Sequence, residues 1–368
     1  MPGETPGNSF YLFSLNQLIM LRSKVAGIGI YLPEKVVTNQ DLERVMDTSD
    51  EWIQERTGIR ERRYAKKHEE STSTMGAIAA RRAMDDAGLE PADIDFVIFA
   101  TLSPDYFFPG CGVLLQRALK LGDVGALDVR NQCSGFIYGL SVADQFIRSG
   151  MYKNILLVGA EFHSAGLDFT TRGRNVTVIF GDGAGALVLQ PSTDQDSMIL
   201  STHLHSNGAH AESLAYINPG CHGGVHLGTE RFGYPNQEFG GAFLTQKMIA
   251  DEDYFPNMDG QAVFKSAVVK FPEVILEALD ANGYQVSDLD MLIPHQANLR
   301  ISQFIQRKLG LRDDQVYNNI MRYGNTTAAS IPIALYEAVK EEKVNKSNLV
   351  CLASFGSGFT WGSALLKW

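Results

Sequence analysis

The segment Asp128-Val-Arg-Asn-Gln-Cys-Ser-Gly-Phe-Ile-Tyr-Gly-Leu140 passes from the end of a β-type run into an apolar helical pattern. Cys133 stands at this junction, and therefore at the N-terminus of the expected helix. Unpaired N–H groups and the helix dipole at such a position favour the thiolate form of a cysteine. The same junction, a strand that leads directly into a helix, is the unit from which sheets covered by helices are built.

Strand-length and helix-length patterns alternate on both sides of this junction. Apolar runs of strand length alternate with i, i+3, i+4 spacing, and Gly88, Gly150 and Gly310 stand where helix C-termini are expected. The expected strands are 25–30, 96–101, 126–129, 155–159, 184–189, 291–294, 349–353 and 363–367. The expected helices are 73–87, 135–149, 264–282, 296–309 and 327–340.

The two halves of the chain also resemble each other. Asn154-Ile-Leu-Leu-Val-Gly-Ala followed by Phe180-Gly-Asp-Gly-Ala-Gly is similar to Asn348-Leu-Val-Cys-Leu-Ala-Ser-Phe-Gly-Ser-Gly-Phe. This repetition indicates an internal duplication of one α/β unit. The alternation predicts parallel or mixed sheets covered by helices.

Two later segments could supply catalytic partners for Cys133. They are Pro294-His295-Gln-Ala-Asn298 and Tyr323-Gly-Asn325-Thr-Thr-Ala-Ala-Ser330. A cysteine nucleophile with a distant His and Asn is typical of covalent catalysis. Taken singly, Cys133 could equally be a buried structural cysteine, His295 a structural histidine at a strand end, and Asn325 a turn residue.

Composition excludes several classes of protein. The 368 residues are 45% hydrophobic and 20% charged, as in an ordinary globular enzyme, and the net charge of −10 argues against nucleic-acid binding. A basic stripe suited to a membrane surface is absent from the sequence, as is an apolar run long enough to span a bilayer. The four cysteines have no framework spacing, which favours a reducing, cytoplasmic location.

Neither a metal nor a nucleotide cofactor is expected. One region gathers several potential ligands without the paired spacing of zinc sites. They are His203, His205, His210, Cys221, His222 and His226. Gly181-Asp-Gly-Ala-Gly185 precedes a strand-like run, whereas the dinucleotide fingerprint opens a helix.

The chain resembles the β-ketoacyl-acyl-carrier-protein synthase III family of thiolase-like condensing enzymes from about Val25 to Trp368. The motifs that carry the resemblance occur in the family's order. They are 47–62, 71–76, Cys133-Ser-Gly-Phe, 179–186, 294–301 and 355–365.

This resemblance implies a thiolase fold, a five-layered α-β-α-β-α arrangement of two duplicated halves. We expect residues 20–190 to form the N-terminal half and residues 191–368 the C-terminal half. Residues 206–260, rich in glycine and aromatics, are interpreted as an insertion. For the N-terminus, the hypothesis is either that Met20 is the native start or that residues 1–19 are a loosely held extension.

The resemblance also implies a reaction. Cys133 accepts an acyl group from an acyl-CoA, and malonyl-acyl carrier protein then decarboxylates and attacks the acyl-cysteine. His295 and Asn325 stabilise the enolate, and the backbone N–H groups of Cys133 and Ser357 form the oxyanion hole. Asn298 is expected to orient His295 or a water molecule.

Further residues are assigned by the same resemblance to binding of the substrates and of a second subunit. Trp52 and Arg56 would bind CoA, together with Arg172 or Arg174, between which the sequence leaves a choice. Phe108 would cross a homodimer interface to line the partner's acyl tunnel, where its bulk favours short primers. The glycine-rich insertion argues the other way, because an extra loop can reshape the mouth of the tunnel. Docking of the acidic carrier protein is assigned to Lys265, Arg300, Arg307 and Lys308.

Three readings of the function follow. The first is initiation of fatty-acid biosynthesis by an acyltransferase that condenses acyl-CoA with malonyl-acyl carrier protein. The second is a related condensation in secondary metabolism, such as alkylresorcinol, quinolone or polyketide priming. The third, a catalytically silent acyl-binding partner subunit, ranks last because Cys133, His295 and Asn325 are all present.

Overall fold

A computed structural model describes residues 21–221 and 243–368. The extension expected over residues 1–19 lies outside this described part, as do residues 222–242 of the expected insertion, including His222 and His226.

The first sheet contains the junction strand that precedes Cys133. Its five strands lie in the order β1-β7-β6-β4-β5. Strand β7 is antiparallel to both β1 and β6, whereas β4 is parallel to β6 and β5. The strands are β1 (Arg22–Tyr31), β4 (Phe96–Ala100), β5 (Gly125–Val129), β6 (Ile155–Glu161) and β7 (Gly183–Ser192).

The second sheet repeats this pattern with the order β8-β13-β12-β11. Strand β13 is antiparallel to β8 and β12, β12 is parallel to β11, and a parallel bridge from Leu292 to Val316 continues the sheet where β5 lies in the first. The strands are β8 (Met198–Ser206), β11 (Met291–Pro294), β12 (Leu349–Gly356) and β13 (Thr360–Lys367). The matching orders and directions confirm two duplicated halves.

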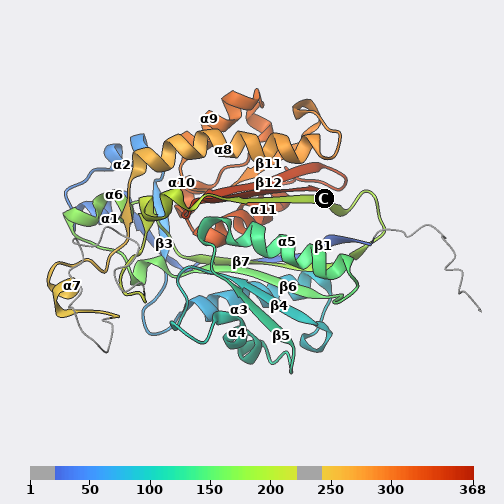
Figure 1. The fold of residues 1–368 in the computed structure, drawn as a ribbon, viewed down its shortest axis with the longest axis horizontal. Coiled ribbons are helices and arrows are strands. Elements are labelled where there is room, and N and C mark those ends of the chain that lie inside the picture. The colour runs from blue at the N-terminus through green and yellow to red at the C-terminus, as the bar shows by residue number, and fades with distance from the viewer. Residues whose placement is uncertain (1–20, 222–242) are drawn as a thin grey trace, which may run out of the picture.

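Helices and sheets form five layers (Figure 1). Helices α3 (Thr72–Ala87) and α4 (Cys111–Leu119) cover the outer face of the first sheet, and α8 (Gly260–Asp280) and α9 (Leu299–Leu309) cover that of the second. Between the sheets lie α5 (Gly135–Arg148) and α11 (Ser330–Lys340), whose apolar side chains meet residues of both sheets in one core cluster. This is the predicted thiolase fold.

Local sequence explains where the helices begin and end. Ser71 caps α3 through a capping box, and Gly88 ends it with a left-handed φ of 67°. Gly310 ends α9 in the same way with a φ of 69°. Helix α9 begins three residues later than predicted, because the Asn298 side chain accepts a hydrogen bond from the Arg300 N–H as its N-cap.

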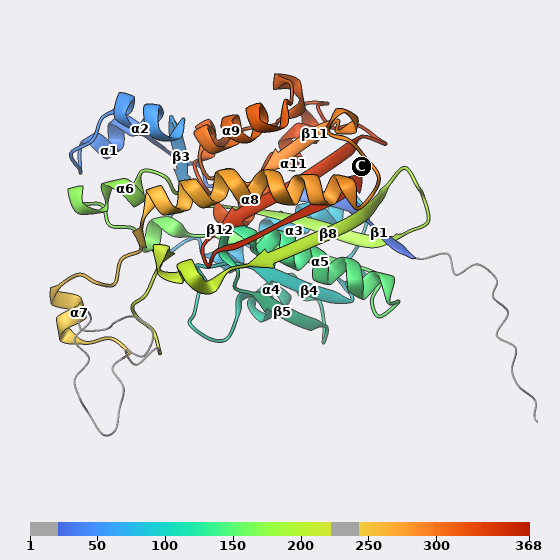
Figure 2. The same ribbon diagram turned by 45° about the horizontal axis from the view of Figure 1, so that its top comes forward.

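Smaller elements complete one end of the molecule. A cap is built from β2 (Lys35–Thr38), α1 (Asn39–Glu43), α2 (Asp50–Thr57), β3 (Glu61–Tyr64), α6 (Arg174–Thr177) and α10 (Ile320–Tyr323). Within residues 206–260, β9 (Leu214–Ala215) pairs with β10 (Asn257–Met258), and α7 (Gln246–Ala250) projects from the body (Figure 2). This segment connects the end of β8 to the start of α8.

Candidate active site

Cys133 lies in a 3-10 turn, Gln132–Ser134, between β5 and the central helix α5. The second half of the chain holds this turn in place. Ser354 donates a hydrogen bond of 2.7 Å to the Cys133 carbonyl, and Ser134 donates one of 2.9 Å to the Thr360 carbonyl. The predicted nucleophile therefore lies where the two halves meet, on a turn fixed from both sides.

Gly356 makes room for the cysteine. A Cβ added at Gly356 would lie 2.5 Å from Cys133 Cβ and 3.0 Å from its Sγ. Because real Cβ atoms do not approach this closely, only glycine fits there without movement of the turn.

The sulfur of Cys133 is buried and surrounded by hydrogen-bond donors. Burial and, to a smaller extent, the nearby Glu161 carboxylate raise the pKa of the thiol to about 12. The backbone N–H groups of Ser357 and Cys133 and the Thr327 hydroxyl point at the sulfur and oppose this rise in pKa. The N–H groups therefore favour the thiolate as expected, but burial outweighs them.

His295 follows strand β11 and is 3% exposed. Its Nδ1 lies 2.6 Å from the Ser330 hydroxyl, and Nε2 is buried without a partner in the described chain. Where the Ser330 hydroxyl donates to Nδ1, the ring proton lies on Nε2, which is then the nitrogen able to donate. Burial lowers the pKa of His295 to about 3, so the ring is neutral at physiological pH.

Asn325 is held by backbone and side chain. Its N–H donates to the Ile179 carbonyl at 2.8 Å, and its carbonyl accepts from the Gly181 N–H at 3.0 Å. The side-chain Oδ1 accepts from the Thr327 N–H at 2.8 Å. This bond fixes which way the carboxamide points and leaves Nδ2 as the group able to donate.

One buried network connects Cys133 and Asn325 and includes residues that the sequence motifs did not indicate. Thr327 contacts the Cys133 sulfur through its hydroxyl and Asn325 through its N–H, and its hydroxyl also lies 2.7 Å from Nε2 of His163. His163 is close enough to His295 that a charge on His295 lowers the pKa of His163, although burial is the larger cause. Thr327 lies within a quoted motif, but no spacing singled out His163.

Glu161 is a further buried residue near Cys133 that the sequence motifs did not indicate. It is fully buried at the end of β6, where it accepts hydrogen bonds from the hydroxyls of Thr101 and Ser103 at 3.1 and 2.6 Å. Burial raises the pKa of Glu161 to about 7, and these hydrogen bonds act in the opposite direction.

Comparison with known proteins gives one consistent family. Residues 127–208 match the family model of 3-oxoacyl-[acyl-carrier-protein (ACP)] synthase III, and residues 279–368 match that of its C-terminal part. Over 346 residues the chain is 46% identical to β-ketoacyl-[acyl-carrier-protein] synthase III of Xanthomonas euvesicatoria, covering 94% of this chain and 98% of the relative.

Solved structures agree. The structure of 3-oxoacyl-[acyl-carrier-protein] synthase III from Aquifex aeolicus has a TM-score of 0.82 at 41% identity, covering 94% of this chain and 100% of that one. The priming β-ketosynthase of the R1128 polyketide pathway has a TM-score of 0.80 at 31% identity, covering 94% and 96%. The chain belongs to the 3-oxoacyl-acyl-carrier-protein synthase III family. It is a condensing enzyme and an acyltransferase.

The residues that the synthase III resemblance assigned to CoA form a stacked cluster. The guanidinium of Arg56 lies 4.4 Å from the ring centroid of Trp52, and that of Arg174 lies 4.7 Å from the same ring. Arg172 instead pairs with Asp168 at 2.7 Å and with Glu252. Of the two arginines between which the sequence left a choice, Arg174 is the one beside Trp52.

The side chains assigned to carrier docking are exposed on the outer layer of the second half. Lys265 lies on α8, and Arg300, Arg307 and Lys308 lie on the neighbouring α9. The side chain of Asn298 makes hydrogen bonds to backbone groups of α9 and of Arg56. It caps α9 and donates a 2.9 Å hydrogen bond to the Arg56 carbonyl, which ties the start of α9 to the residue beside Trp52.

Phe108 is 81% exposed, in a loop that precedes α4. Phe107 and Val113 beside it are 58% and 41% exposed. Helix α4, which carries Val113, is tied to the edge strand β5 by a 3.1 Å hydrogen bond from the Gly112 N–H to the Asp128 carboxylate.

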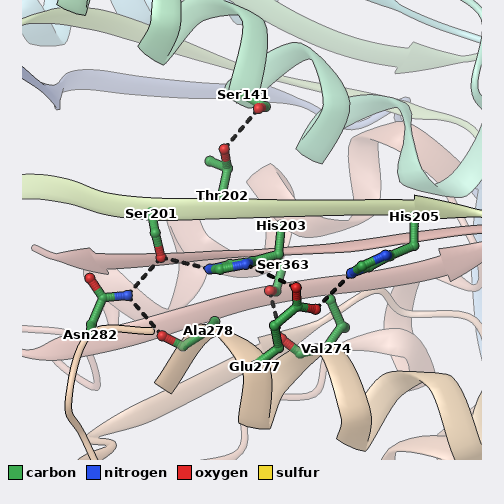
Figure 3. Close-up of polar contacts among 10 residues, drawn as sticks. All are labelled: Ser141, Ser201, Thr202, His203, His205, Val274, Glu277, Ala278, Asn282 and Ser363. Carbon is green, nitrogen blue, oxygen red and sulfur yellow. Dashed lines mark hydrogen bonds and ion pairs between the residues drawn. The ribbon is translucent and has the colours of Figure 1, made fainter. Parts of the chain in front are cut away.

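The two histidines of β8 share one carboxylate as their partner. Strand alternation directs His203 and His205 to the same side, where Glu277 of α8 lies 3.3 Å from His203 Nδ1 and 2.7 Å from His205 Nε2 (Figure 3). Ser201 joins the cluster 2.9 Å from His203 Nε2. In residues 21–221 and 243–368, no group of three or more His, Cys, Asp or Glu is arranged to hold a metal ion, and no helix is long and apolar enough to cross a bilayer.

Proposed function

We propose that the enzyme initiates fatty-acid biosynthesis by decarboxylative Claisen condensation of an acyl-CoA primer with malonyl-acyl carrier protein. The main support for this proposal is the set of hydrogen-bond donors around the Cys133 sulfur. Two backbone N–H groups, from Cys133 and Ser357, converge there, and neutral His295 belongs to the same buried region.

The first half-reaction is acyl transfer. Cys133 Sγ bonds to the thioester carbon of acyl-CoA, the C–S bond to CoA breaks, and the thiol proton leaves with the CoA sulfur. Negative charge develops on the carbonyl oxygen, and the N–H groups of Cys133 and Ser357 are suitable donors to it. No metal or organic cofactor is needed for this step.

The second half-reaction is decarboxylation and carbon–carbon bond formation. Carbon dioxide leaves the malonyl thioester, and the resulting enolate carbon attacks the acyl carbon on Cys133, whose sulfur then departs. His295 Nε2–H and Asn325 Nδ2–H are neutral donors for the enolate oxygen. A neutral histidine suits this role because it need not be desolvated as a cation.

Recognition of the substrates is assigned to two surfaces. The indole of Trp52, with Arg56 and Arg174, would stack the adenine of CoA and bind its phosphates. Arg172 contributes less, because its charge is paired with Asp168 and Glu252. Lys265, Arg300, Arg307 and Lys308 give an enzyme of net charge −10 a local basic surface for the acidic carrier protein.

A homodimer would complete the acyl site. Strand β5 ends the strand order of the first sheet, so a second copy could extend the sheet across this edge. The exposed Phe107, Phe108 and Val113 lie beside it, and Phe108 would then enter the partner's acyl tunnel and favour short primers. A mass of two chains by light scattering, reduced to one chain by Phe107→Ser with Val113→Asp, would support this assembly.

A test separates the two half-reactions by intact mass. Enzyme incubated with acetyl-CoA is expected to gain one acetyl group, which malonyl-acyl carrier protein then removes, while Cys133→Ala gains none. Labelling only by longer acyl-CoAs would favour a priming role in secondary metabolism, such as that named for the R1128 relative. Absence of every adduct would contradict the proposal.

A cytoplasmic location suits the four free cysteines.

A further inference from the structure

A buried histidine outside the assigned catalytic set contacts the nucleophile through one intermediate side chain. His163 follows strand β6 and is 7% exposed. Its Nε2 lies 2.7 Å from the Thr327 hydroxyl. The turn that holds Thr327 packs against the turn that holds Cys133, where the Thr327 hydroxyl lowers the pKa of the thiol. Neither His163 nor Thr327 has a role in the mechanism described above.

The surroundings fix the position of both side chains. The His163 ring packs on Phe180 with a centroid separation of 4.6 Å, and the His163 carbonyl accepts from the Gly166 N–H at 2.9 Å. Thr327 has a φ of 48°, an unusual value for a β-branched residue. Its N–H is bound by Asn325 Oδ1, so this backbone is held by the same residue that is assigned to the enolate.

The protonation state of the Cys133 sulfur determines which groups donate in the hydrogen bonds of Thr327. A thiolate accepts only, so the Thr327 hydroxyl must donate to it. The Thr327 oxygen is then an acceptor toward His163, whose Nε2 must carry the ring proton. Burial, and a smaller effect of His295, lower the pKa of His163 to about 3, so the ring is neutral and has a single N–H.

We infer that His163 is a positioning residue whose Nε2–H holds the Thr327 hydroxyl as a hydrogen-bond donor to the Cys133 thiolate. This inference rests on the proposed function only in taking Cys133 as the nucleophile. The arrangement resembles that of His295 and Ser330, but it acts on the sulfur instead of on the enolate. Three titratable neighbours face the same region: Glu161, His295, and Asp182, whose carboxylate accepts a hydrogen bond from the His163 backbone N–H. Glu161 disfavours the Cys133 thiolate, and the Thr327 hydroxyl opposes this effect by donating to the sulfur.

The test measures the thiolate directly, without condensation. Folded full-length protein is treated with iodoacetamide between pH 7 and 9, and alkylation of each cysteine is followed by peptide mass spectrometry. Exposed Cys221 in the same sample is the internal control for the reagent. The alkylation rate at Cys133 is expected to fall about tenfold in His163→Ala, because a hydrogen bond to a charged group is lost.

Conservative variants separate positioning from mere packing. His163→Gln keeps an N–H at the same distance along the side chain, and it should recover most of the rate. Thr327→Val should lose the rate and Thr327→Ser should keep it. A structural role alone would lower the thermal midpoint of His163→Ala and leave the ratio of Cys133 to Cys221 alkylation unchanged.

Two results would overturn the inference. One is a folded His163→Ala protein whose Cys133 alkylation matches wild type across the pH range. If that variant does not fold, the Thr327 pair decides, and equal rates for Thr327→Val and Thr327→Ser overturn it. Acylation by acyl-CoA is measured separately in wild type, so failure of the proposed condensation would be seen there and not in this experiment.

Discussion

Nδ1 of His295 lies 2.6 Å from the hydroxyl of Ser330, the first residue of the central helix α11. The contact joins a strand end of the second sheet to a helix of the middle layer. A Ser330 hydroxyl that donates to Nδ1 keeps the ring proton of this neutral, buried imidazole on Nε2, the nitrogen proposed to donate to substrate.

Replacement of Ser330 by alanine should therefore impair the second half-reaction only. Discharge of acyl-Cys133 by malonyl-acyl carrier protein is expected to slow about 10- to 100-fold, as when a supporting residue of a catalytic donor is lost. Acylation by acyl-CoA should remain near wild type. Ser363→Ala, which removes another buried hydroxyl from a 2.8 Å hydrogen bond, is the matched control and should leave both steps unchanged. Equal losses in both half-reactions would contradict this role.

The pKa of His295 predicts the pH dependence of discharge. Because His295 is neutral down to about pH 3, enzyme acylated beforehand should react with malonyl-acyl carrier protein without an acid limb near pH 6.5. Single-turnover rates from pH 5.5 to 8 test this. A tenfold fall from pH 7 to 5.5 in folded protein would mean that the imidazole titrates normally.

The free energy of unfolding should also depend on pH, because burial lowers the pKa values of two histidines in the folded protein. The folded-state pKa values of His163 and His295, about 3, lie below the unfolded value of 6.5. The unfolded chain therefore binds protons first, and the free energy of unfolding should decrease as pH falls from 6.5 toward 3. Urea unfolding at pH 7, 6 and 5 is the measurement, and His163→Gln should show a shallower decrease than wild type. An identical slope for the two proteins would argue against a depressed pKa at His163.

Gly356→Ala should damage the site by steric overlap with Cys133. The added Cβ would lie 2.5 Å from Cys133 Cβ, so the turn must move, at a cost of about 1–3 kcal/mol of unfolding free energy. Acylation should also be reduced. Gly208→Ala is the control, because an added Cβ there meets nothing within 4 Å. Wild-type stability and acylation in Gly356→Ala would show that the close contact is absent in solution.

The two candidate arginines should differ in their effect on acyl-CoA. Arg174→Ala removes a guanidinium from the Trp52 ring and is expected to raise the KM for acyl-CoA about tenfold, as loss of a stacked and phosphate-binding group would. Arg172→Ala should have a smaller effect because its charge is already paired. The reverse order of effects would assign CoA to Arg172.

Much of the fold was predictable because its signals are local. Apolar runs and i, i+3, i+4 spacing predicted strands such as β6 and helices such as α3, and Gly88 and Gly310 marked helix ends through their positive φ. The repeated sequence around Asn154 and Asn348 predicted the duplication. The short pair β2 and β3 has only four residues in each strand, too few for a periodic signal, and it was missed.

The site was less predictable because its properties depend on packing. The helix N-terminus suggested a thiolate at Cys133, whereas burial, which no local pattern reports, raises the thiol pKa to about 12. The choice between Arg172 and Arg174 depended on which side chain reaches Trp52 and which reaches Asp168. His163 is far from Thr327 in sequence, and only the fold brings them within 2.7 Å.

The central claim is that Cys133 carries the acyl group between two substrates. Its most direct test is the intact mass of wild type and Cys133→Ser after incubation with acetyl-CoA, with peptide mapping of the adduct. We predict one acetyl group on Cys133 that malonyl-acyl carrier protein discharges, and no dischargeable adduct in the variant. An acetyl group on another residue, or condensation by Cys133→Ser at the wild-type rate, would contradict the account.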